Sequence, residues 1–112
     1  MSGIHNANAQ LSLAVDALAT LSSTLKERLI YAAFHIVNDM KAEDLPHGEL
    51  RSKFERLEKS LTHLPPQPPS DGSIQATIQA MTDSEAEETA RAILALAREV
   101  QEEAWRQTNT TR

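Results

Sequence analysis

The chain has 112 residues, of which 40% are hydrophobic and 4% aromatic, and it contains no cysteine. That length suits one domain, and the lack of cysteine excludes disulfides, thiolate metal sites and cysteine nucleophiles. The formal net charge of −5 would repel a phosphate backbone, so we expect no nucleic-acid partner. Because no apolar run reaches the ~20 residues of a membrane span, we expect no membrane partner and a cytoplasmic location.

Composition and periodicity predict an all-α fold. Leucine, alanine, isoleucine and valine dominate the apolar residues, and no run alternates β-branched with polar residues as a strand would. We predict a single helical domain over 1–112, a small bundle of four to five helices with a long N-terminal helix or helix pair and a long C-terminal helix. The polar ends, 1–8 and 107–112, are predicted to be disordered tails.

The first helical stretch covers residues 10–41. Its apolar positions alternate in steps of four and three from Leu11 to Met40, which places them on one helical face. One helix of about 30 residues is therefore one interpretation. We favour two helices with a break at 22–24, because Thr24 and Glu27 have the spacing of a capping box.

A leucine-rich stripe marks the next helix. Pro46 excludes a helix interior, so we expect residues 42–45 to connect two helices, the second beginning at Asp44 or Leu45. The stripe has helical spacing and a polar back, as in a peripheral helix. Its members are Leu50, Phe54, Leu57, Leu61 and Leu64. The proline-rich segment 65–72 is predicted to be a linker between helices.

Two further helices are expected after the linker. Ile74, Ile78 and Met81 indicate a short one. Thr82 and Glu85 form a second capping-box match, which predicts a long final helix to about Arg106.

No arrangement of residues predicts catalysis. The densest group of ligand types is Asp39, Glu43, Asp44 and His47, but acidic residues near a helix start are stabilised by the helix dipole alone. The four histidines lack the i, i+4 spacing of two ligands on one helical face. We therefore assign no catalytic residue, no metal site and no cofactor.

One alternative is a small all-α metal-dependent nucleotide hydrolase. Glu55 and Glu58, followed by Glu85 and Glu88, resemble the carboxylate pairs with which all-α nucleotide pyrophosphohydrolases hold magnesium. The chain departs from that family's pattern because its second pair lacks an aspartate. The resemblance implies helix-borne carboxylates as metal ligands, and we do not assign the chain to that family.

An excess of apolar residues on the helix around 25–40 favours a different function. More than half of its circumference is apolar or aromatic, and a lone tryptophan lies near the end of the last helix. We therefore expect a non-enzymatic protein-interaction module, an adaptor, small subunit or inhibitor that forms a homo-oligomer, most simply a dimer, or binds another protein. The interface candidates are Ile30, Tyr31, Phe34, His35 and Trp105.

Overall fold

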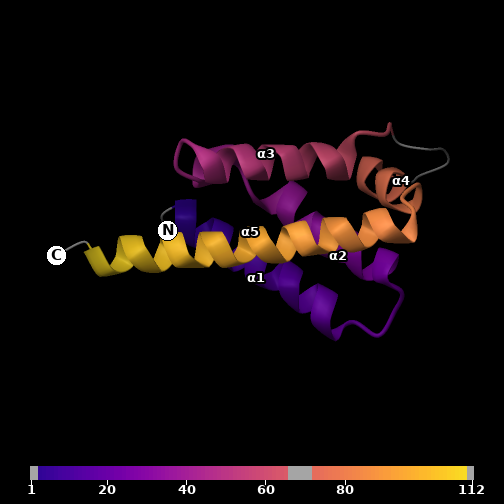
Figure 1. Ribbon diagram of the computed structural model, residues 1–112, viewed down its shortest axis with the longest axis horizontal. Helices are drawn as coiled ribbons and strands as arrows, with labels where there is room; N and C mark the ends of the chain where they lie inside the picture. The colour runs from indigo at the N-terminus through magenta and orange to yellow at the C-terminus, as the bar shows by residue number, and fades with distance from the viewer. Residues whose placement is uncertain (1–2, 66–71, 111–112) are drawn as a thin grey trace.

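Five α-helices and one short 3-10 turn make up the regular structure (Figure 1). The computed structural model describes residues 3–65 and 72–110, and these contain no strand. The helices are α1 (Gly3–Thr20), α2 (Leu25–Asp39), α3 (Glu49–Thr62), α4 (Ser73–Gln79) and α5 (Asp83–Thr110), with η1 (Ala42–Asp44) as the 3-10 turn. The predicted all-α bundle of four to five helices is confirmed. The molecule measures 52 × 26 × 23 Å, and α5 follows its long dimension (Figure 1).

The N-terminal stretch forms two helices, as the capping box predicts. The Thr24 hydroxyl accepts a hydrogen bond from the Glu27 amide at 3.2 Å, and the Glu27 carboxylate accepts one from the Thr24 amide at 3.1 Å. These bonds satisfy amide groups that a helix start otherwise leaves unpaired. The second capping box is also present at the start of α5, where Thr82 and Glu85 bond reciprocally at 2.8 and 3.1 Å.

The predicted N-terminal tail is wrong for residues 3–8, which belong to α1. Ile4 and Ala7 are buried in the core, so the first turns of α1 are held by apolar packing. The Asn6 amide adds two hydrogen bonds of 3.0 Å, to the Asp39 carbonyl and to the Asp44 carboxylate. A polar composition near a terminus therefore concealed a helix that is anchored by tertiary contacts.

The helix after the connector begins later than predicted, at Glu49 rather than at Asp44 or Leu45. Asp44 instead closes the 3-10 turn, since its carboxylate accepts a 3.0 Å hydrogen bond from the Lys41 amide. Leu45 follows as a core residue, 1% exposed. Gly48 directly precedes α3 with a φ of 120°, a backbone region that favours glycine.

The predicted C-terminal tail is wrong for residues 107–110, since α5 continues to Thr110. Side chains in this last part bond back along the helix. The Thr108 hydroxyl donates to the Ala104 carbonyl at 3.0 Å, and the Asn109 amide donates to the Trp105 carbonyl at 2.8 Å. The remaining tail residues, 1–2 and 111–112, and residues 66–71 of the predicted linker lie outside the described ranges.

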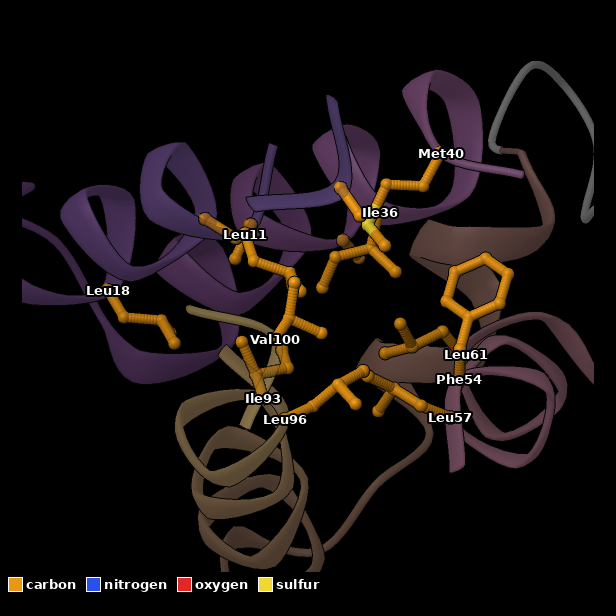
Figure 2. Packing of buried hydrophobic residues seen from close by; sticks show 14 of the residues in the cluster. Leu11, Leu18, Ile36, Met40, Phe54, Leu57, Leu61, Ile93, Leu96 and Val100 are labelled. Atoms are coloured by element: carbon orange, nitrogen blue, oxygen red, sulfur yellow. The ribbon is translucent and has the colours of Figure 1, made fainter. Parts of the chain in front are cut away.

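One hydrophobic core joins the helices: α5 packs against α1, α2 and α3, and α2 also packs against α3 and α4 (Figures 1 and 2). Figure 2 shows the α3 stripe pointing toward the α5 stripe. The members of these two stripes are Phe54, Leu57 and Leu61 on α3 and Ile93, Leu96 and Val100 on α5. The leucine-rich stripe identified in the sequence is therefore the face by which α3 joins the bundle.

Candidate interaction surfaces

The outer side of α2 carries two exposed aromatic residues one helical turn apart. Tyr31 is 57% exposed and Phe34 is 38% exposed. They share this side with the exposed polar residues Glu27 and Asn38, at the spacing of one helical face. We refer to Glu27, Tyr31, Phe34 and Asn38 as the α2 outer face. Phe34 also lines a hollow of about 300 Å³ beside Ile74 of α4.

Two other interface candidates on α2 are less accessible. Ile30 is only 8% exposed and belongs to the hydrophobic core, and α4 packs against α2. The Lys26 ammonium, one turn before Ile30, donates a 3.2 Å hydrogen bond to the Gln79 carbonyl at the end of α4. Ile30 is therefore a core residue. His35 is half-buried, and its Nδ1 lies 3.9 Å from the Asp39 carboxylate.

Trp105 is the most exposed large hydrophobic residue in the described ranges, at 68%. It lies near the C-terminal end of α5, which projects beyond the other helices in Figure 1. Leu94, 44% exposed, precedes it by eleven residues, and three helical turns return the chain to nearly the same face. Trp105 therefore belongs to α5, whereas the α2 outer face lies on a different helix.

A groove between α3 and α5 was not anticipated from the sequence. Its wider part encloses about 390 Å³, and a hollow of about 380 Å³ continues it toward α4. Ser60, Glu88 and Thr89 line both parts, so the two hollows form one channel, which we call the α3–α5 groove. Its floor is apolar, since Leu57 and Leu96 line it from the two facing stripes.

One ion pair crosses the α3–α5 groove. The Lys53 ammonium lies 2.7 Å from the Glu99 carboxylate, and this hydrogen bond raises the pKa of Lys53 above its ordinary value of 10.5. Ala92 and Ala95 line the same stretch of α5 and are too small to fill the space. In the sequence, Lys53 and Arg56 are visible as basic residues beside the leucine stripe. No local pattern identifies the helix that lies opposite them.

The carboxylates of the hydrolase alternative are divided between different surfaces. Glu85 and Glu88 line the α3–α5 groove, whereas neither Glu55 nor Glu58 lines either of its hollows. Asp44, which belongs to the other group of possible metal ligands, accepts hydrogen bonds from Asn6 and Lys41. Across residues 3–65 and 72–110, no three acidic or histidine side chains gather as possible metal ligands.

Comparison with protein-family models, with curated proteins and with solved structures finds no match to this chain. Among the described helices, none has both the length and the apolar character needed to cross a membrane. The observations that bear on function are therefore the surfaces of the bundle itself: the α2 outer face, the exposed end of α5 and the α3–α5 groove.

Proposed function

We propose that this protein is a non-enzymatic protein-interaction module, an adaptor, small subunit or inhibitor that binds another protein through the α2 outer face and also self-associates. The observation that carries the proposal is the exposure of Tyr31 and Phe34 side by side on one helix. Removing a large apolar side chain from water contributes about 1.5–3 kcal/mol, and aromatic residues are enriched in protein interfaces.

The neighbouring helix α1 also exposes an apolar residue, Leu13. The Asn6 amide bonds the Asp39 carbonyl and the Arg28 guanidinium bonds the Leu18 carbonyl, so α1 and α2 run antiparallel. This register sets Leu13, which is also exposed, at the level of the middle of α2. Exposed apolar residues on both helices support a partner that covers the α1–α2 pair.

The proposal is tested by replacing Tyr31 with glutamate. Proteins retained from a cell extract by the wild-type chain are identified by mass spectrometry, and the candidate partner is then purified for affinity measurement. We expect Tyr31→Glu to weaken binding at least about tenfold, because a buried charge would replace an aromatic anchor. Gln101→Glu, which adds the same charge at an exposed position of α5, is the matched control and should bind as wild type.

A second variant tests whether Phe34 belongs to the surface or to the core. Phe34→Asp should also abolish binding while circular dichroism shows unchanged helicity, since Phe34 is 38% exposed. Loss of the helical signal in Phe34→Asp would assign this residue to the core instead. Binding that survives Tyr31→Glu at wild-type affinity would remove the α2 outer face from the proposal.

A further inference from the structure

The ionisable side chains that line the α3–α5 groove are divided by sign. The α3 edge carries the basic residues Lys53, Arg56 and His63. The α5 edge carries the acidic residues Glu85, Glu88 and Glu99. The groove therefore has a basic edge and an acidic edge along an apolar floor.

Part of this charge has no ion-pair partner among residues 3–65 and 72–110. Lys53 and Glu99 neutralise each other across the groove. Arg56 and Glu88 are both exposed, and neither forms an ion pair with another residue in the described part of the chain. One cation and one anion are thus available on opposite edges.

A face with two edges of opposite sign can be complementary to itself. A two-fold axis that runs along the groove, parallel to the helices, sets two grooves face to face and exchanges their edges. The basic edge of each copy then lies opposite the acidic edge of the other. An axis directed across the groove would instead place like charges together, which opposes association.

We propose that a second copy of this chain occupies the α3–α5 groove, in a two-fold dimer whose axis runs along the groove. This inference rests on the self-association in the proposed function and assigns its surface. It places Arg56 of each copy on the side of the other copy's acidic edge. The exposed alanines Ala92 and Ala95 lie at the centre of the interface, where the two apolar floors face each other.

Charge complementarity favours a second copy over other occupants. A strongly basic partner would be repelled by Arg56, and a strongly acidic one by Glu88, whereas a second copy meets each edge with the opposite sign. The net charge of −5 also makes two copies repel in general, so they associate where their charges alternate. The small side chains of Ala92 and Ala95 allow the helices of the two copies to approach closely.

The test uses two charge reversals on the full-length chain, Arg56→Glu and Glu88→Arg. Solution mass is measured by sedimentation equilibrium over a wide concentration range. We expect a wild-type dimer, and for each single variant a dissociation constant at least about tenfold higher, because like charges then face each other. Circular dichroism serves as the folding control, since both residues are exposed.

Mixing the two variants is the decisive step. The Arg56→Glu chain has acidic residues on both edges of its groove, and the Glu88→Arg chain has basic residues on both edges. An equimolar mixture of the two should therefore form a heterodimer with wild-type affinity. The double variant, Arg56→Glu with Glu88→Arg, should recover the homodimer. A dimer unaffected by either reversal, or a mixture that stays monomeric, overturns the assignment of this face.

The remaining outcomes distinguish the inference from the proposed function. A wild-type dimer that dissociates on Tyr31→Glu but not on Arg56→Glu keeps self-association and moves it to the α2 outer face. A wild-type chain that is monomeric at every concentration refutes both self-association and the dimer through the α3–α5 groove. Binding of another protein through the α2 outer face is measured separately and is not affected by that result.

Discussion

The α1–α2 pair and the α3–α5 pair join their helices with different side chains. The first pair buries alanines completely, Ala7 and Ala14 on α1 with Ala32 and Ala33 on α2. The second pair meets through large stripe residues such as Leu57, and hollows of about 390 and 380 Å³ remain beside the stripe. Small residues let helix axes approach, whereas a narrow stripe of large residues keeps the flanks of the helices apart.

This difference indicates how stability and binding are divided in the molecule. A closely packed contact between two helices has little freedom to change shape, and truncating a side chain there leaves a void. A pair of helices with open space beside its contact can bind a second molecule there without unfolding. We therefore expect the α1–α2 half to determine folding stability and the α3–α5 half to determine self-association.

The largest expected effect is a difference between two leucine truncations. Leu11→Ala in the closely packed half should lower the free energy of unfolding by about 3–5 kcal/mol, because Leu11 is fully buried and its cavity cannot be filled by water or neighbours. Leu57→Ala at the floor of the α3–α5 groove should cost about 2 kcal/mol, since the groove already borders its side chain. Urea denaturation measures both values. Equal losses would contradict the division of the molecule into a closely packed and an open half.

An intermediate effect is expected at Gly3, where α1 approaches the η1 turn. A Cβ atom added at Gly3 would lie 2.8 Å from the Asp44 Cα atom, so the backbone must shift. Gly3→Ala should cost about 1–3 kcal/mol and accelerate amide hydrogen exchange in the first turns of α1. Gly72→Ala is the matched control, because a Cβ atom there meets no described residue within 4 Å. Unchanged exchange in Gly3→Ala would show that the N-terminus of α1 is not held by this contact.

The smallest effect concerns the ion pair across the α3–α5 groove. Glu99→Gln should lower the pKa of Lys53 toward 10.5, because the Glu99 carboxylate is the main cause of its rise. A raised pKa in the folded state means that the pair contributes stability below pH 10.5, and that this contribution disappears as the pH rises through the Lys53 pKa. An NMR titration of the Lys53 side chain compares the two proteins. Identical midpoints would exclude the Glu99 contact in solution.

Local patterns predicted the features that depend on a few neighbouring residues. Both capping boxes are present, at Thr24 and at Thr82, because a cap is formed within one helical turn. The leucine stripe of α3 is the buried face of that helix for the same reason: periodicity alone defines a face. The helical class of the protein followed from these signals.

Features that depend on contacts between distant segments were missed or misplaced. Ile30 was predicted to lie at an interface, since periodicity does not show that the other helices bury it in the core. Asn6 looked like part of a polar tail, although its hydrogen bonds to Asp39 and Asp44 fix the start of α1. The α3–α5 groove needs the pairing of two helices that are separated in sequence, so neither helix alone reveals it.

The packing of α1 against α5 has a consequence for the order in which the chain folds. His5 and Thr108, 103 positions apart, lie within 3.4 Å through their Nε2 and Oγ1 atoms, so α1 is covered by α5, which is synthesised much later. The α1–α2 hairpin can form while translation continues, but the side of α1 that meets α5 stays open until α5 has left the ribosome. A nascent chain truncated within α5 would therefore expose apolar surface of α1, which α5 covers in the folded protein.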